Sequence, residues 1–362
     1  ENIAEYDPLN IIAKFGADAL RYTLVTNSVP GLDMNLDLRR VEAARRFCQK
    51  IWQATRFVLG NVRDDDTPQK FNAELLLKLQ IPDEWILSRL QNVIKHVGES
   101  MEAYKYLEGG REIYNFFWNE FCDWYIESCK YRLDKSDSRS ITLAVLFFVL
   151  ESSLRLLHPI MPFITEKLWQ ALPDQIKDET ALIIASWPEI DTTMINESSE
   201  SKFDQLMGII KGIRAIRGEF RIDTSKALPV TIIAKKIPDV LQSCRTEFIS
   251  LARLDPERLE ISKVQSKTRN VQSAHFIIGD VNVYISLPGL VDFPSEKDRT
   301  TKELVKITSQ LEQLNGKLSS EFIEKAARNA VEREEQRQKE LQDKVSQLKN
   351  KLKILEGGEE GS

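Results

Sequence analysis

The most informative chemistry in this sequence is a row of cations that shares a helix face with an aromatic ring. Residues 45–61 read RRFCQKIWQATRFVLGN, and the apolar residues around them repeat with a helical period. At about 100° per residue, Lys50 and Phe57 fall within about 20° of Arg39, well away from the apolar face, with Arg46 beside them. Cations bind phosphates and an exposed ring can stack an unpaired base, so this face predicts contact with single-stranded nucleic acid. Packing of Phe57 against another helix would produce the same pattern, and helix geometry alone leaves both interpretations open.

A second cationic stretch, IIKGIRAIRGEFR at residues 209–221, has a similar arrangement. Its cations fall within an arc of about 120° beside an apolar face, and one acid, Glu219, interrupts them. These cations are Lys211, Arg214, Arg217 and Arg221. The pattern fits an RNA contact and a solvated helix face equally well.

Residues that could support covalent or metal chemistry are scattered. The 3 histidines, His96, His158 and His275, are too far apart in the sequence to predict a metal site or a catalytic triad. The pair Gly316-Lys317 lacks the following Ser or Thr and the glycine spacing of a phosphate-binding loop. The sequence therefore predicts no catalytic residues and no metal ligands.

The composition limits the class of protein. With 362 residues the chain exceeds one ordinary core, and 42% hydrophobic with 29% charged residues is typical of a soluble globular protein. A net charge of -5 argues against binding polyanions over the whole surface, but it allows a local basic site. By inspection no apolar run approaches the ~18–20 residues that span a membrane, so no membrane association is expected. The cysteines lack C-x-x-C spacing and are expected to be buried thiols, which suits a reducing, cytoplasmic location; they are Cys48, Cys122, Cys129 and Cys244.

Helices dominate the elements that must position these residues. Residues 1–36 predict two short helices, with Asp7-Pro8 as an N-terminal cap, Gly16 as a stop and Pro30-Gly31 as a turn. Further helices are expected near 37–60, 83–107, 110–133, 138–157, 160–171 and 199–221. Their breaks are expected at residues 64–66, 109–110, 134–138 and 158–159.

The pattern changes after residue 221. LPVTIIA and HFIIGDVNVYISL are rich in β-formers, Gly279-Asp280 fits a two-residue hairpin turn, and a helix is expected near 237–252. From residue 291 two apolar stripes with steps of three and four residues predict an antiparallel helical hairpin. The stripes are Leu304, Ile307, Leu311, Leu314 and Leu318, then Val331, Leu341, Val345, Leu348, Leu352, Ile354 and Leu355. A solvated two-helix arm and a dimerisation seam both fit this pattern.

Seven segments in this order resemble the C-terminal part of the valine–tRNA ligase (valyl-tRNA synthetase) family. They are DPLNIIAKFGADALRYTL (7–24), VPGLDMNL (29–36), RRFCQKIWQATRFV (45–58), WILSRL (85–90), FWNEFCDWYIE (117–127), HPIMPFITEKLW (158–169) and IRAIRGEFRI (213–222). The segment FWNEFCDWYIE and the terminal hairpin distinguish this family from its isoleucine and leucine relatives, which share the helical bundle but lack that arm.

The resemblance implies a mainly α fold in five parts. Residues 1–36 would be a remnant of the region that follows the catalytic domain, and 37–221 a helical-bundle anticodon-binding domain. Residues 222–290 would form a small α+β subdomain, 291–356 an antiparallel coiled-coil tRNA-binding arm, and 357–362 a disordered tail.

The resemblance also implies an anticodon-binding site, formed by Arg39, Lys50, Phe57 and Glu120. Phe57 would stack a base, while Lys50 and Arg39 would bind base edges or phosphates. Glu120 would accept a hydrogen bond from an exocyclic amine. Gln49 and Gln53 stand where the family usually has asparagines, which is a departure from its pattern. Further cations expected to contact the tRNA backbone are Arg46, Lys211, Arg214, Arg217, Arg221, Lys302, Lys306, Lys317, Arg328, Arg333 and Arg337.

The implied function is the tRNA-binding portion of an enzyme that attaches valine to its tRNA using ATP. The sequence has no "HIGH"-type or "KMSKS"-type loop and no inserted editing domain, so the chain alone is expected to be inactive. No cofactor is expected in this chain, whereas ATP and Mg would serve the full ligase. The expected partner is valine tRNA, with the chain monomeric or bound to a separate catalytic polypeptide. The alternatives are a non-catalytic helical scaffold and a subunit that works in trans with that polypeptide.

Overall fold

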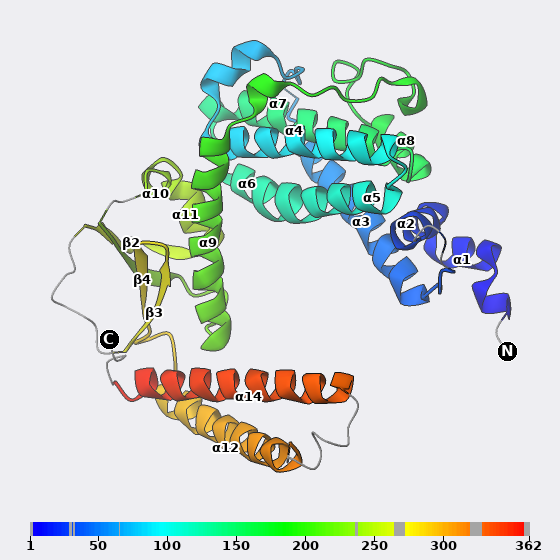
Figure 1. The fold of residues 1–362 in the computed structure, drawn as a ribbon. Coiled ribbons are helices and arrows are strands. Elements are labelled where there is room, and N and C mark those ends of the chain that lie inside the picture. The colour runs from blue at the N-terminus through cyan, green and yellow to red at the C-terminus, as the bar shows by residue number, and fades with distance from the viewer. Residues whose placement is uncertain are drawn as a thin grey trace. The chain divides into compact units, whose positions relative to one another are not determined.

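The computed structural model describes residues 3–28, 31, 33–64, 66–235, 238–263, 272–318 and 328–357 (Figure 1). The chain divides into two compact units, one of residues Glu1–Gln205 with Gln242–Glu247 and one of Leu206–Leu241 with Phe248–Ser362. Helices predominate, accompanied by one small four-stranded sheet, so the mainly α fold is confirmed.

The first unit begins with the two short helices that the sequence predicts. They are α1, Pro8–Phe15, after a 3-10 turn at Ile3–Tyr6, and α2, Ala17–Asn27. The Asp7 carboxylate accepts hydrogen bonds from the backbone N–H of Leu9 at 2.8 Å and of Asn10 at 3.4 Å, as expected of an N-terminal cap. Gly16 ends α1 with φ 94°, a conformation that favours glycine. Gly31 of the expected turn has φ 78°, and its partner Pro30 lies outside the described residues.

Longer helices form the bundle of the first unit. They are α3 Leu38–Gly60, α4 Ile81–Glu102, α5 Tyr106–Asn115, the π-helix Phe116–Ile126, α6 Glu127–Leu133, α7 Ser136–Leu157 and α8 Pro162–Trp169. Short 3-10 turns lie at Ala73–Lys78, Leu182–Ile184 and Thr192–Met194. Large side chains such as Trp85, Trp169 and Phe47 are fully buried between these helices. Helix α2 packs on α3 and α5, so residues 1–36 belong to the same unit as the bundle.

The break expected at Gly109-Gly110 is wrong. Helix α4 instead ends at Glu102, and Tyr104, with φ 59°, lies in the connection to α5. Gly110 lies inside α5, where an added Cβ would come within 2.7 Å of Thr26 Cγ2, and its carbonyl accepts a 2.9 Å hydrogen bond from the Tyr22 hydroxyl. Glycine is therefore needed for the close approach of α5 to α2, and it does not interrupt the helix.

Helix α7 also corrects the sequence analysis. Among the described residues, its segment Asp137–Leu157 is long and apolar enough to cross a membrane by length and composition, contrary to the expectation that no run approaches this length. In the structure 78% of that window is buried inside the protein. Its apolar surface is thus covered by the neighbouring helices of the bundle, as in the central helix of a core.

Helix α9, Glu197–Glu219, contributes residues to both units. In the second unit, β1 Leu228–Ala234, β2 Leu254–Ser262, β3 Ser273–Ile278 and β4 Val281–Ser286 form a sheet of order β2-β1-β4-β3. Strand β1 is parallel to β2 and antiparallel to β4, and helices α10 Val240–Ser243 and α11 Arg245–Ala252 precede β2. The predicted β3–β4 hairpin is present, with Gly279 at φ 58°. Strand β2 was not predicted, because an edge strand buries few side chains and four of the nine residues of its sequence, LDPERLEIS, are charged.

The hairpin of the last segment is confirmed. It pairs α12, Phe293–Lys317, with α14, Arg328–Leu355 (Figure 1). Three cross-contacts fix the antiparallel order: Asn315 with Gln338 at 2.7 Å, Glu303 with Lys344 at 3.3 Å, and Lys297 with Glu356 at 2.8 Å. The seam buries Ile307, Leu314, Leu348 and Leu355. Residues 358–362 of the expected tail lie outside the described residues.

Candidate nucleic-acid interface

The cations and the phenylalanine that the sequence places on one helix face lie in a row along α3. We call these residues, Arg39, Arg46, Lys50 and Phe57, the α3 row. Asp37 caps the helix by accepting a 2.9 Å hydrogen bond from the Arg39 N–H, and its carboxylate also pairs with the Arg39 guanidinium at 2.8 Å. This guanidinium holds the pKa of Asp37 below its usual value. The Arg39 and Arg46 side chains are 89% and 63% exposed, whereas Phe57 is half-buried. At 1.5 Å per residue, Arg39 and Phe57 lie roughly 27 Å apart along the axis.

The middle of this row is built from two elements. The Lys50 ammonium lies 2.8 Å from an Asp123 carboxylate oxygen and 5.2 Å from the centroid of the Trp118 ring. Trp118 in turn stacks on Tyr114, with ring centroids 5.5 Å apart and planes at 24°. Trp118, Asp123 and Tyr114 also belong to this surface, and the sequence did not predict them as members. The π-helix Phe116–Ile126 contains Trp118 and Asp123, so their side chains do not follow the 3.6-residue period used to assign faces.

Glu120 pairs with an arginine of the protein, whereas the family resemblance implies that its carboxylate accepts a hydrogen bond from a base. Its two carboxylate oxygens accept hydrogen bonds from Arg89 of α4, at 2.8 and 3.0 Å, and Arg89 also lies 3.6 Å from Glu200. The carboxylate of Glu120 raises the pKa of Arg89 further above its ordinary value. Within the described part of the chain, no hydrogen bond or ion pair joins any two of Arg39, Lys50, Phe57 and Glu120. The π-helix therefore supplies Asp123 as the carboxylate partner of Lys50 and Glu120 as the carboxylate partner of Arg89.

Trp52 is an exposed aromatic residue that the sequence analysis did not select. Its side chain is 43% exposed on α3. On a helical wheel it lies about 220° from Arg39, at the margin of the apolar arc, so periodicity assigns it to the edge of the core. Phe47 on the same helix is fully buried and contacts Tyr114, with ring centroids 4.8 Å apart.

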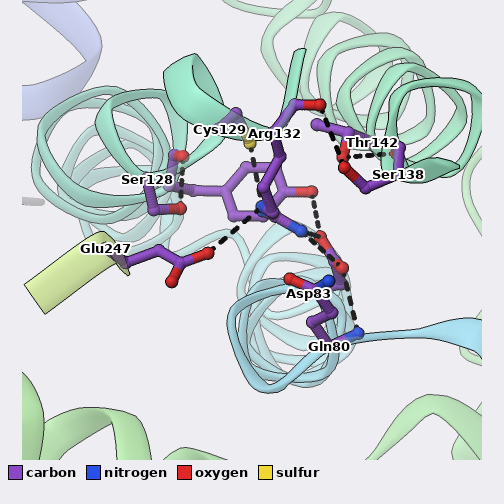
Figure 2. A network of polar contacts seen from close by, with 9 residues as sticks. Gln80, Asp83, Ser128, Cys129, Arg132, Ser138, Thr142 and Glu247 are labelled. Carbon is purple, nitrogen blue, oxygen red and sulfur yellow. Dashed lines mark hydrogen bonds and ion pairs between the residues drawn. The ribbon is translucent and has the colours of Figure 1, made fainter. Parts of the chain in front are cut away.

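A buried polar network holds the π-helix in place (Figure 2). The Arg132 side chain is 3% exposed and donates from Nη1 to both oxygens of Asp83 at 2.7 Å. The Tyr125 hydroxyl of the π-helix donates to the same carboxylate at 2.7 Å, and the Gln80 N–H donates to it at 3.1 Å. Glu247 lies 3.8 Å from Arg132 Nε, and burial raises the pKa of Glu247. The network joins the start of α4, the π-helix, α6 and the first turn of α11.

One cation of the second stretch, Arg217, is internal, which corrects its predicted role. Arg217 is only 8% exposed and donates to the carbonyls of Asp223, Lys226 and Arg253 at 2.8, 2.9 and 3.2 Å. Arg214 donates to the carbonyl of Leu251 at 2.9 Å. Arg217 is therefore not available as a surface phosphate ligand, because its side chain is buried and its N–H groups donate to backbone carbonyls. Lys211, Arg214 and Arg221 remain exposed.

The predicted arm cations lie on the surface. All six are exposed, and they are Lys302, Lys306, Lys317, Arg328, Arg333 and Arg337. Lys302 contacts Asp298 at 2.6 Å and Arg328 contacts Glu332 at 3.1 Å, each one helical turn away. Exposed pairs of this kind contribute little to stability, so these cations can exchange a carboxylate for a phosphate at low cost.

Groups suited to covalent or metal chemistry are not assembled in the described residues. No group of three or more potential metal ligands occurs among them. Burial raises the pKa of Cys48, Cys122, Cys129 and Cys244 to about 12. Burial also lowers the pKa of His158, whose Nδ1 lies 2.8 Å from the Thr165 hydroxyl.

Comparison with known proteins gives two family matches. The model of the anticodon-binding domain of tRNA ligase matches residues 83–232, and that of the valyl tRNA synthetase tRNA binding arm matches residues 292–356. The first match begins after α3, so Arg39, Lys50 and Phe57 lie outside it.

Curated relatives extend the similarity over nearly the whole chain. The valine–tRNA ligase of Thermotoga maritima is 37% identical over 97% of the chain, and that of Fervidobacterium nodosum is 38% identical over 97%. The valine–tRNA ligase of Pseudothermotoga lettingae is 39% identical over 96%. The chain spans 38% of the length of each of these relatives. The chain thus belongs to the valine–tRNA ligase family and carries the family's anticodon-binding domain and tRNA-binding arm.

Proposed function

We propose that this chain is the tRNA-binding portion of a valine–tRNA ligase. The observation that carries the proposal is the presence, in one chain, of an anticodon-binding domain match and a tRNA-binding arm match in that order. The exposed cationic row on α3 and the exposed cations of the arm supply groups of the right chemistry on each domain. Valine tRNA is the proposed ligand.

The α3 row is proposed to bind the anticodon loop. Exposed Arg39 can bind a phosphate or a base edge, and the partly exposed ring of Phe57 can stack an unpaired base. Lys50 would remain close to Asp123 and Trp118 and present its ammonium to the same loop. Glu120 keeps acceptor capacity beyond its two bonds from Arg89, because an ionised carboxylate has about four lone-pair sites.

The arm is proposed to bind the tRNA backbone without reading its sequence. Its exposed cations are distributed along α12 and α14, and a helix of 25 residues, such as α12, extends roughly 37 Å. This length suits contact with a second region of a bound tRNA, and the family resemblance suggests the outer corner where the D and T loops meet.

The remaining properties are proposed from the family. Valine, ATP and Mg would be handled by the catalytic part of the whole ligase, and no cofactor is assigned to this chain. The chain would act in the cytoplasm as a monomer or together with a separate catalytic polypeptide. The other candidate is a helical scaffold that uses the same bundle and arm for protein partners.

A binding titration tests the proposal against that scaffold. Valine tRNA and a version with an altered anticodon are titrated into the chain at two salt concentrations. Tighter binding of valine tRNA, with an affinity that falls steeply as salt rises, is expected. Equal binding of both tRNAs would refute anticodon reading, and the absence of binding at either salt concentration would favour the scaffold.

A further inference from the structure

Three cations of the second unit meet at the turn 223–226, which lies between α9 and β1. The Arg217 guanidinium, near the end of α9, donates to carbonyls at both ends of this turn and to that of Arg253, the residue before β2. These bonds hold the turn and the start of β2 together. We call Arg217, Lys226 and Arg253 the turn cluster.

The side chains of Lys226 and Arg253 are exposed and are held by backbone carbonyls. Arg253 Nη1 donates to the carbonyl of Thr224 at 2.6 Å. The Lys226 ammonium lies 3.3 and 3.4 Å from the carbonyls of Leu290 and Gly289. A guanidinium and an ammonium each have several N–H donors, so both side chains are oriented by the protein and keep donors that a ligand can use.

Because their partners are neutral carbonyls, these cations keep their full charge. Within the described part of the chain, no carboxylate forms an ion pair with any member of the turn cluster. The acid of the turn, Asp223, accepts hydrogen bonds from the N–H and Oγ of Ser225, both at 2.7 Å. The turn cluster therefore has an excess of positive charge even when Asp223 is counted against it.

The exposed cations described above differ in this respect. Several of them have a carboxylate partner, and these are Arg39, Lys50, Lys302 and Arg328. The segment 209–226 carries five cations and two acids, although the whole chain has a net charge of -5. The turn cluster is thus a local basic surface on an acidic chain.

A separate observation indicates that two of these charges lie close together. Burial and the positive charge of Arg253 lower the pKa of Arg217, and Asp223 acts in the opposite direction. Like charges that are held near one another raise the free energy of the folded state, and burial of Arg217 keeps water from screening them. A bound anion would offset this repulsion.

We propose that the turn cluster binds the phosphate backbone of the tRNA, with Lys226 and Arg253 as direct ligands and Arg217 as a buried charge behind them. Phosphate oxygens supply both the hydrogen-bond acceptors and the negative charge that this surface lacks. RNA is favoured over other polyanions because the chain carries an anticodon-binding domain and a tRNA-binding arm. The inference rests on the proposed function and adds a contact region to it, since Arg253 lies between the two family matches and belongs to neither.

A titration of the full chain with valine tRNA at several salt concentrations tests this proposal. The double variant Lys226→Gln with Arg253→Gln should bind about tenfold more weakly, and the slope of log affinity against log salt should fall by about 2. The loss should be equal for valine tRNA and for a version with an altered anticodon, because a phosphate contact carries no sequence information. Arg253→Lys alone should keep binding within about threefold of the wild type, because it retains the charge.

The matched control removes two other exposed cations from the same strands. Lys235 directly follows β1, at its far end from the turn, and Arg258 lies within β2. The double variant Lys235→Gln with Arg258→Gln has the same net charge as the test variant and should bind within about twofold of the wild type. Equal losses in the two double variants, or an unchanged salt slope in the test variant, would overturn the proposal.

Titration with a plain RNA duplex separates this inference from the proposed function. The duplex should bind with the same dependence on the variants, because it presents the same phosphates. If valine tRNA and the altered version bind equally, anticodon reading fails, while the difference between the double variants still decides the turn cluster. If valine tRNA is preferred and the double variants behave alike, the turn cluster fails and the proposed function stands.

Polyglutamate distinguishes RNA from an acidic protein as the ligand. It should compete poorly with the RNA at equal concentration of charge, because a carboxylate chain does not present the phosphate oxygens. Displacement of the RNA as effective as that by unlabelled RNA, with the same dependence on Lys226 and Arg253, would overturn the assignment to RNA and favour an acidic protein.

Discussion

At the residue scale, Lys50 occupies the middle of the row of cations on α3. Its ammonium is held between Asp123 and the Trp118 ring, so it is oriented before any ligand binds. Arg39, near the start of α3, is 89% exposed, and Phe57, near the end, is half-buried. The row therefore combines an oriented cation, an exposed cation and an aromatic edge, which are the groups that the proposed single-strand binding surface requires.

Replacing Phe57 with alanine tests whether this ring binds a base. Phe57→Ala should weaken tRNA binding by about 1–3 kcal/mol because the base no longer stacks, with little change in Tm, because the ring is only half-buried. Trp52→Ala is the matched control, since Trp52 is exposed on another side of α3 and its removal should leave binding unchanged. A decrease of about 3–5 kcal/mol in the folding free energy of Phe57→Ala would instead identify a core residue.

Cys129 predicts a measurable pH dependence of stability. Burial raises its pKa to about 12, above the value of about 8.5 for a free thiol, so the folded state holds the proton more tightly. The protonated thiol therefore makes its full contribution to the free energy of unfolding below about pH 8.5. As the pH rises from there toward 12 this contribution is lost, and the free energy of unfolding falls by about 1.4 kcal/mol per pH unit. Urea unfolding between pH 8 and 10 should show a shallower decline for Cys129→Ala. Parallel declines in the two proteins would contradict the assignment.

At the element scale, the π-helix Phe116–Ile126 places its side chains through its anchoring at both ends. One end stacks Trp118 on Tyr114 of α5, and the other contributes the Tyr125 hydroxyl to Asp83. The Asp83–Arg132 pair is almost fully buried, and a protein is strongly destabilised when one partner of such a pair is removed.

Asp83→Asn should therefore cost about 3–5 kcal/mol of folding free energy, because Arg132 would remain charged and buried. The matched control is Glu127→Gln, which breaks the exposed pair with Lys130 on α6 and should cost less than about 1 kcal/mol. Urea unfolding measures both. Arg132→Met added to Asp83→Asn should recover part of the stability, and a cost below about 1 kcal/mol in Asp83→Asn alone would show that the network is not structural.

At the scale of the whole molecule, the bundle and the arm are expected to divide specificity and affinity. Replacing Lys306, Arg333 and Arg337 with glutamine should weaken binding of all tRNAs alike. The slope of log affinity against log salt should fall by about 1 for each phosphate that is no longer neutralised. Deletion of residues 292–362 should likewise weaken binding of all tRNAs and lower the salt slope. The preference for tRNA with a valine anticodon should remain. An unchanged salt slope in both variants would instead point to self-association through the leucine seam.

The chain should also be inactive by itself. It spans 38% of the length of its relatives, and the adenylate-forming loops expected of a ligase do not occur in its sequence. Incubation with valine, ATP and valine tRNA should give neither pyrophosphate exchange nor aminoacylation. Activity above that of a mock purification would contradict this expectation.

The sequence by itself determined the features that depend on local periodicity and on single capping residues. The face of α3, the seam of α12 and α14, the Asp7 cap and the Gly279 turn all follow from neighbours within a few residues. Tertiary structure decided where side chains find partners distant in sequence. Arg217 turns inward and donates to backbone carbonyls of the following loops, and Gly110 permits α5 to approach α2.

In the candidate site too, some residues could be predicted from the sequence and others depend on tertiary packing. The cations of α3 could be chosen from their spacing, but Trp118 and Asp123 could not, because a π-helix displaces side chains from the 3.6-residue period. The pairing of Glu120 with Arg89, and of Lys50 with Asp123, depends on how α3, α4 and the π-helix pack. Helical periodicity fixes the direction of a side chain around its own axis, whereas only packing determines which group of another helix it meets.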